Sequence, residues 1–174
     1  RSEARGYYTE YQITYNNPSE SEGPSPKFFS NETSAYKYMW DNSIHNDVEY
    51  QGIITTKGVY TFKSGYNGGD MPPIRKLGNK YYYSNLQVLG HIHVHQIPEA
   101  NHFSFAGKNP DSETMNEYPG LPFFLMTMDK CLDGMRFYYG KYRRINGYPK
   151  TVNELFDESN PLKLIPFLKN YIRW

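Results

Sequence analysis

The sequence Gly90-His91-Ile92-His93-Val94-His95 places three of the five histidines of the chain at alternate positions. It follows an apolar, β-prone run from Leu86 and is followed by Pro98, which predicts a strand that ends at the histidines. Because alternate residues of a strand point to one face, the three imidazoles should lie side by side. A His-X-His pair with a carboxylate downstream favours a metal site over merely packed or solvated histidines.

The bulk properties of the chain exclude several classes of protein. Its 174 residues suit one domain with its own core, and 19 basic against 18 acidic residues leave no net charge that would favour nucleic acid or an anionic membrane. A single cysteine, Cys131, allows no internal disulfide. No apolar run approaches the roughly 20 residues that span a bilayer, and Arg1-Ser2-Glu3 does not resemble a signal peptide, so membrane insertion is not expected.

The composition and hydrophobic spacing of the sequence divide the chain into two parts. Residues 1–27 are predicted to hold a tyrosine-rich strand and a linker rich in Pro and Ser, and residues 28–174 form the domain. Within the domain, residues 31–45 have the spacing of an amphipathic helix with Trp40 inward. The β-prone segments 48–55 and 58–62, separated by Thr56-Lys57, then predict a hairpin.

Around and after the histidines, loops, strands and helices alternate, which indicates an α/β (α+β) fold. The glycines and prolines of residues 64–80 predict a long loop between the hairpin and the histidine strand. The remaining predicted elements are a short helix from Pro110 to Tyr118, strands at 121–128 and 135–139, and one or two helices in 152–156 and 162–174, interrupted at Pro161 and Pro166. Lys141, Arg143 and Arg144 are interpreted as solvated surface.

The residue types near the histidines suggest a hydrolytic zinc centre. Zinc in such a site takes three protein ligands and leaves a position for water, whose pKa it lowers to about 7. His93 and His95 would supply two nitrogens, and Asp111, at the start of the following helix, is the nearest carboxylate in a suitable place. Glu49, a charged residue within a largely apolar β-prone segment, is the candidate acid/base, and Ser104 the candidate oxyanion donor.

The order of helix, Glu, hairpin, Gly-X-X-His-X-His, Ser and Asp resembles the JAB/MPN metalloprotease domain. The JAMM motif of that domain consists of Glu, His-X-His, Ser and Asp. Gly90 to His95 matches the histidine motif, which selects His93 and His95 as ligands. The segments 46–52, 58–60, 103–104 and 120–124 are similar to a bacterial branch found at the C-terminus of Rhs-type polymorphic toxins. Two departures are the distance from Ser104 to Asp111, interpreted as an enlarged loop, and Gln96 where the family has proline.

The resemblance implies a cytidine deaminase-like, curved mixed sheet flanked by helices. It also implies a Zn²⁺-dependent peptidase or isopeptidase with Glu49 as acid/base, His93, His95 and Asp111 as metal ligands, and Ser104 as oxyanion donor. Its partners would be a protein or peptide substrate and an immunity protein, and it would be a secreted or delivered bacterial effector that acts in a target cell. Two alternatives stay open: an inactive interaction module, and a cupin with His93, His95 and Glu99 as ligands.

Overall fold

The computed structural model describes residues 26–46, 48–63, 71–96, 101–107 and 110–172. The tyrosine-rich strand and most of the linker predicted in residues 1–27 lie outside these ranges. In the described part of the chain, no helix is both long and apolar enough to cross a membrane.

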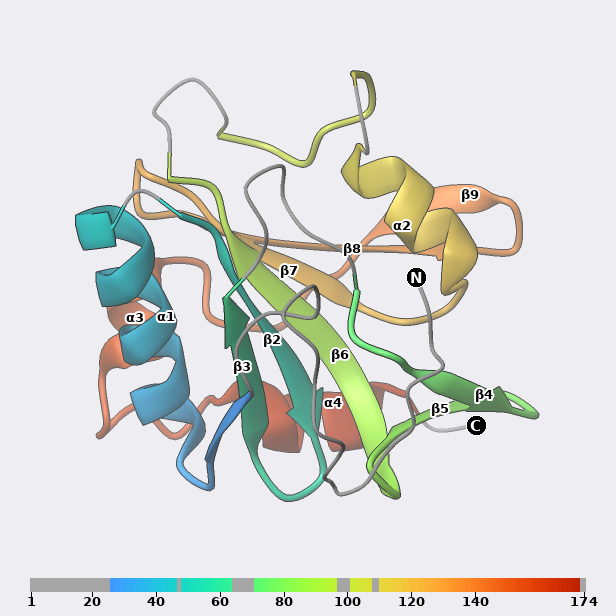
Figure 1. Cartoon of the computed structure of the whole chain (residues 1–174), viewed down its shortest axis with the longest axis horizontal. Coiled ribbons are helices and arrows are strands. Elements are labelled where there is room, and N and C mark those ends of the chain that lie inside the picture. The colour runs from blue at the N-terminus through green and yellow to red at the C-terminus, as the bar shows by residue number, and fades with distance from the viewer. Residues whose placement is uncertain (1–25, 47, 64–70, 97–100, 108–109, 173–174) are drawn as a thin grey trace.

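The fold is a mixed α+β arrangement in which helices flank an open and mostly antiparallel sheet (Figure 1). Over the described residues the sheet has nine strands, with the order β1-β3-β2-β6-β7-β8-β9 and with β5 pairing both β4 and β6. The strands are β1 (Lys27–Phe29), β2 (Tyr50–Thr55), β3 (Val59–Lys63), β4 (Arg75–Leu77), β5 (Lys80–Tyr83), β6 (Leu86–Val94), β7 (Phe123–Met126), β8 (Leu132–Tyr138) and β9 (Lys141–Arg144). The helices are α1 (Glu32–Asn46), α2 (Asp111–Glu117), α3 (Val152–Phe156) and α4 (Leu164–Tyr171).

The central strand β6 pairs antiparallel with β2 and parallel with β7. Parallel neighbours need a crossover connection, and the chain between β6 and β7 contains α2. Because parallel strands end at the same edge of a sheet, the last residues of β6, the end of β7 and the crossover come together there. This edge is where the histidine motif ends.

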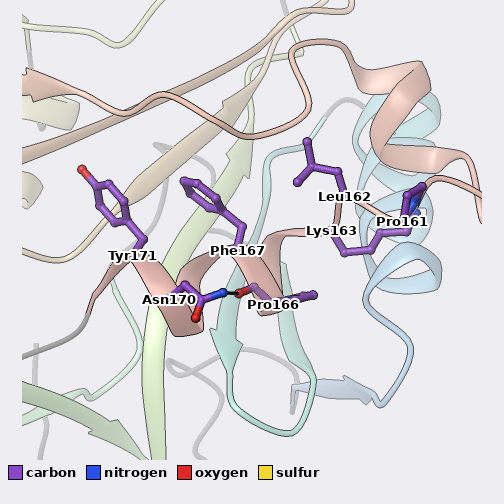
Figure 2. Close-up of a pocket in the computed structure, with 7 residues that line it drawn as sticks. All are labelled: Pro161, Leu162, Lys163, Pro166, Phe167, Asn170 and Tyr171. Carbon is purple, nitrogen blue, oxygen red and sulfur yellow. Dashed lines mark hydrogen bonds between the residues drawn. The ribbon is translucent and has the colours of Figure 1, made fainter.

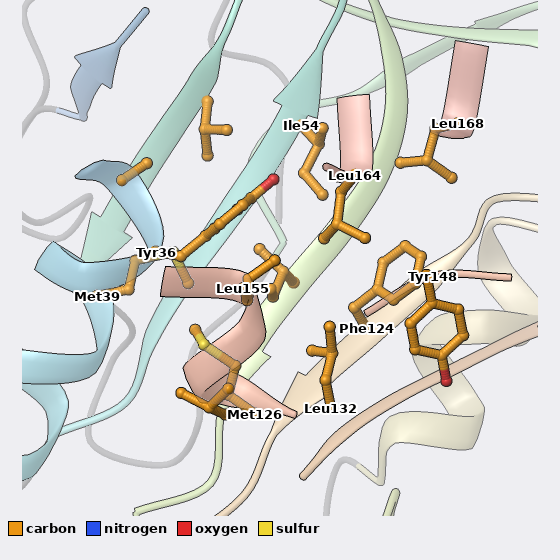
Figure 3. Packing of buried hydrophobic residues seen from close by; sticks show 14 of the residues in the cluster. Tyr36, Met39, Ile54, Phe124, Met126, Leu132, Tyr148, Leu155, Leu164 and Leu168 are labelled. Atoms are coloured by element: carbon orange, nitrogen blue, oxygen red, sulfur yellow. The ribbon is translucent and has the colours of Figure 1, made fainter. Parts of the chain in front are cut away.

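One face of the sheet is covered by α1, α3 and α4. Figure 3 shows side chains from these three helices meeting apolar residues of the central strands, within a cluster of buried side chains. The predicted helix at 31–45 is confirmed as α1, with Trp40 only 9% exposed. Gly52 of β2 permits the close approach of α1, because a Cβ there would lie 2.9 Å from the sulfur of Met39.

The C-terminal helices confirm the prediction that the tail closes one side of the sheet, with a correction at Pro166. This residue lies inside α4 and does not interrupt it. It is the third helical residue, where the backbone nitrogen has no acceptor within the helix, so a proline removes no hydrogen bond. Glu32 at the start of α1 ties α4 to α1, because both carboxylate oxygens accept the backbone N–H of Ile165 at 3.1 Å.

The opposite face of the sheet holds the three histidines beside a second apolar cluster. Ile53 of β2, Phe123 and Leu125 of β7 and Met115 of α2 are buried in this cluster. A bulge in the β2–β6 pairing, at which Ile54 faces Gly90 and Thr55 faces Val88, resets the alternation of β6 before the histidines. The histidines therefore share the face on which α2 packs.

Two predictions about segments need correction. Residues 64–80 are not one loop: β4 and β5 form a hairpin whose two-residue turn begins at Gly78, which has a φ of +63° that favours glycine. Residues 64–70 of this segment lie outside the described ranges. The second strand after α2 begins at Leu132, three residues earlier than predicted.

Two further predictions are confirmed, and two strands at the edges of the sheet were not predicted. The hairpin of β2 and β3 is confirmed, and so is the short helix α2, with Pro110 as its N-cap residue. The sequence did not predict the edge strands β1 and β9. Lys141, Arg143 and Arg144 belong to β9, whose four residues are all exposed, as expected of solvated surface.

Candidate metal centre

His93, near the end of β6, and His95, the first residue after this strand, point toward the same side. Both side chains are buried, at 6% and 7% exposure, in the described part of the chain. Their Nε2 atoms lie 3.2 Å apart, so the two imidazoles converge on one point instead of packing flat against neighbours. The prediction that the strand ends at the histidines and turns them to one face is confirmed.

Asp111 reaches the histidines from the start of α2. Its Oδ1 lies 3.2 Å from Nε2 of His93, and its Oδ2 lies 3.3 Å from Nε2 of His95. Two reciprocal hydrogen bonds hold it in place: the Ser104 backbone N–H donates to Oδ2, and the Asp111 backbone N–H donates to the Ser104 hydroxyl oxygen, each at 2.8 Å. The lengthened segment between Ser104 and Asp111 therefore brings the carboxylate back to the histidines.

The three groups have the dimensions of a zinc site. In tetrahedral zinc with bonds of about 2.0–2.1 Å, neighbouring ligand atoms lie about 3.3 Å apart. The three separations here, 3.2 Å between the imidazoles and 3.2 and 3.3 Å from them to the carboxylate, have this length. Among the described residues, His93, His95 and Asp111 are the group of His, Cys, Asp or Glu side chains that could hold a metal ion. Two nitrogens and one oxygen are a ligand set that could hold a metal ion such as zinc.

The electrostatics of the site also favour a bound cation. Burial lowers the pKa of His93, but the charge of Asp111, its hydrogen bond and the charge of Glu49 together raise it above the ordinary value. Burial raises the pKa of Asp111, but His93 and the hydrogen bonds from His93, His95 and Ser104 outweigh it and hold this pKa far below its usual range. The carboxylate is therefore ionised and favours positive charge where the three groups meet.

Glu49 lies next to the site, immediately before β2. The prediction placed it within a strand, whereas β2 begins one residue later, at Tyr50. Gln51 pairs with His93, and continuing this antiparallel register by two residues brings Glu49 level with His95. Its carboxylate is close enough for its charge to act on His93. Glu49 is half-buried, which leaves it open to both water and the site.

Ser104 positions Asp111, a role that the sequence did not predict. Its backbone N–H and hydroxyl oxygen position Asp111, as described above. A serine hydroxyl that accepts one hydrogen bond still has its own proton to donate, so the predicted oxyanion role is compatible with this arrangement. Glu99, the third ligand of the cupin alternative, lies outside the described residues.

Sequence reasoning missed Gln51, which supports the third histidine. The Gln51 Oε1 lies 2.9 Å from Nε2 of His91, so Nε2 carries the proton and the amide oxygen accepts it. Burial and the nearby His93 lower the pKa of His91 well below the ordinary value, so this ring is neutral. It packs on Phe123 at a centroid distance of 5.0 Å. The available signal was a polar residue two positions after Glu49 in an otherwise apolar strand.

We expect Gln51→Leu to lower the free energy of unfolding of the metal-free protein by about 1–3 kcal/mol, because it leaves the buried His91 N–H without an acceptor. Urea unfolding measures this loss. The double variant Gln51→Leu/His91→Leu is the control: removing both polar partners should cost less than the sum of the two single changes. Strict additivity would show that the Gln51–His91 contact contributes nothing to stability.

The pocket in Figure 2 lies away from these residues. It has a volume of about 360 Å³ and is formed by α4 and the segment before it, on the helix-covered side of the sheet. Its lining residues are Pro161, Leu162, Lys163, Pro166, Phe167, Asn170 and Tyr171. None of the candidate site residues contributes to it, and it offers no group of metal ligands.

Comparisons with known proteins leave the fold and the site as the basis for a functional conclusion. No family model matches the chain, no curated protein matches it, and no solved structure matches it.

Proposed function

We propose that this protein is a zinc-dependent hydrolase that cleaves an amide bond of a peptide or protein. The observation that supports this most strongly is the triangle of His93, His95 and Asp111, whose ligand atoms are spaced as around a tetrahedral zinc ion. Three protein ligands leave the fourth position open, which is typical of catalytic zinc and not of structural zinc. Bound zinc supplies Lewis acidity and lowers the pKa of a water molecule to about 7.

The remaining residues act on protons and charge. Glu49, beside His93 but outside the ligand triangle, would take a proton from the attacking water and return it to the leaving amine. Ser104 would donate a hydrogen bond from its hydroxyl group to the developing oxyanion while its backbone N–H holds Asp111. His91 would keep the strand rigid through Gln51 and would not bind the metal.

The proposal extends to a JAB/MPN-like peptidase or isopeptidase. What supports it is the order of α1, Glu49, the β2–β3 hairpin, the histidine strand, Ser104 and Asp111 along a chain whose sheet is flanked by helices. By the resemblance to the Rhs-associated branch, the domain would be the effector part of a larger bacterial protein, with an immunity protein as a partner.

Zinc affinity of Asp111 variants tests this proposal. Asp111→Ala removes a direct ligand, so zinc affinity should fall by more than the roughly 10–100-fold typical of losing an outer partner. Asp111→Asn, which keeps an oxygen for the Ser104 N–H, separates the loss of the charged ligand from loss of local structure. Isothermal titration with Zn²⁺ measures the affinities.

The matched control is Glu113→Ala, which removes an exposed carboxylate from the same first turn of α2. It should leave zinc affinity unchanged. If Asp111→Ala binds zinc as tightly as the parent while Glu49→Gln does not, then Glu49 is the third ligand and the proposed mechanism is wrong.

A further inference from the structure

Two exposed aromatic rings lie together beside the candidate metal centre. Phe105 is 51% exposed and Tyr142 is 37% exposed, and their ring centroids are 5.0 Å apart in an edge-to-face arrangement. We infer that this pair, the Phe105–Tyr142 platform, binds an aromatic or large apolar side chain of the peptide substrate, near the amide bond that is cut. The inference rests on the proposed function and specifies its substrate.

The platform is connected to the metal ligands through two short routes. Phe105 directly follows Ser104, whose backbone N–H donates to the Asp111 carboxylate at 2.8 Å. The Tyr142 hydroxyl lies 2.9 Å from Oδ1 of Asn116 and 3.4 Å from the carbonyl oxygen of Ser112, the residue after Asp111. The platform and the carboxylate are thus held to the same short helix.

The distance between the Asp111 carboxylate and the platform indicates which part of a substrate could reach the platform. The path from the Asp111 carboxylate through the Ser104 nitrogen to the Phe105 backbone is on the order of 7 Å, about two residues of extended peptide. A peptide with its amide carbon at the metal centre would therefore place a side chain one or two positions away against Phe105. The platform would thus recognise a position adjacent to the cut bond, not a remote part of the substrate.

Tyr142 is held in place by packing and by a hydrogen bond, which suits the platform for binding a ligand. Phe137 of β8 packs on Tyr142 at a centroid distance of 4.9 Å, and it contacts the buried cluster that also contains Met115 of α2. Tyr142 is therefore fixed on one side by β8 and at its hydroxyl by α2. Aromatic rings that are held rigidly lose little conformational freedom when a ligand packs on them, which makes such residues frequent anchors in recognition.

Charge and polarity favour an apolar occupant. The rings of Phe105 and Tyr142 present uncharged surface, and the Tyr142 hydroxyl is already bonded to α2. An acidic substrate side chain would lose hydration there without gaining a partner from the platform, because the faces of aromatic rings carry partial negative charge. A Phe, Tyr, Leu or Met side chain would instead remove apolar surface from water on both partners and could pack edge-to-face against the rings.

The test uses the zinc-loaded full chain. Mass spectrometry of a random decapeptide pool first locates the bond that the protein cuts. Two matched decapeptides are then compared, one with Phe and one with Ser next to that bond. The wild type should cleave the Phe peptide with a kcat/KM about 10–200-fold higher than that of the Ser peptide. Phe105→Ala should remove most of this preference, mainly through a higher KM for the Phe peptide, with zinc content unchanged.

Two variants serve as controls. Phe28→Ala removes a similarly exposed ring, 42% exposed, from β1 at the other end of the sheet order, and should keep the preference. Tyr142→Phe keeps the ring and removes the bond to Asn116, so it should retain most of the preference, whereas Tyr142→Ala should lose it. Loss of preference in Phe28→Ala, or full preference in both alanine variants of the platform, would overturn the inference.

A binding measurement separates failure of the inference from failure of the proposed function. Zinc-loaded Glu49→Gln, which should turn over substrate roughly 10²–10⁴-fold more slowly than the wild type, is titrated with both peptides by calorimetry, with and without Phe105→Ala. If the wild type cuts no peptide of the pool, two decapeptides that differ by Phe or Ser at a central position are titrated instead. Tighter binding of the Phe peptide that depends on Phe105 would then support the platform, and the absence of cleavage would overturn only the hydrolase proposal. Cleavage by the wild type with equal kcat/KM and equal affinity for both peptides would overturn the platform and leave the hydrolase proposal intact.

Discussion

The variant His93→Ala/His95→Ala should bind no stoichiometric zinc. It removes both imidazoles of the triangle and leaves Asp111 as a single carboxylate, which does not hold the metal alone. Inductively coupled plasma mass spectrometry of the purified protein, after incubation with Zn²⁺ and dialysis, gives the metal content. Zinc at 100 times the wild-type dissociation constant should stabilise the wild type by about 2.7 kcal/mol, and this stabilisation should vanish in the variant.

His45→Ala is the control for this experiment, because His45 is an exposed histidine in the last turn of α1. It should bind one equivalent of zinc and be stabilised as the wild type is. Unchanged zinc content in the double variant would refute the assignment of the metal centre, and with it the proposed chemistry.

Glu49→Gln should lower the rate of amide hydrolysis by roughly 10²–10⁴-fold while the fold and the zinc affinity persist. The glutamine side chain has nearly the same shape as glutamate but cannot accept and return a proton. Single-turnover kinetics on the best decapeptide measures the rate, and calorimetry measures the affinity. Glu113→Gln, the same change at an exposed position on α2, should leave the rate unaltered. A zinc-dependent rate that is unaffected by Glu49→Gln would require another base.

The parts of the site that follow local rules could be predicted from the sequence. The alternation of His91, His93 and His95 is a property of one strand, so a single face was evident from spacing alone. Asp111 was found because it begins a helix after a loop. Its approach to the histidines, however, depends on the two hydrogen bonds with Ser104, which no local pattern encodes.

Other features depend on contacts between distant segments and could not be predicted. Gln51 meets His91 only because β2 and β6 pair in one register, and forty positions separate the two residues. The short strand β4 pairs with β5, which in turn pairs with β6, whereas its glycine-rich surroundings suggested a loop. The Phe105–Tyr142 platform likewise joins the segment after Ser104 to an edge strand that the pattern did not reveal.

The hydrogen bond between Glu32 and Ile165 couples local unfolding of α4 to α1. The Glu32 carboxylate is partly buried, and burial raises its pKa. The Tyr36 hydroxyl and the first backbone amides of α4 donate hydrogen bonds to it and so offset its lost hydration. Detaching α4 would expose Leu164 and Leu168 and would also strip this carboxyl group of its amide partners. Fraying of the C-terminal helix is thereby coupled to the first helix across 133 positions of sequence, so hydrogen exchange in α1 and α4 should slow and quicken together.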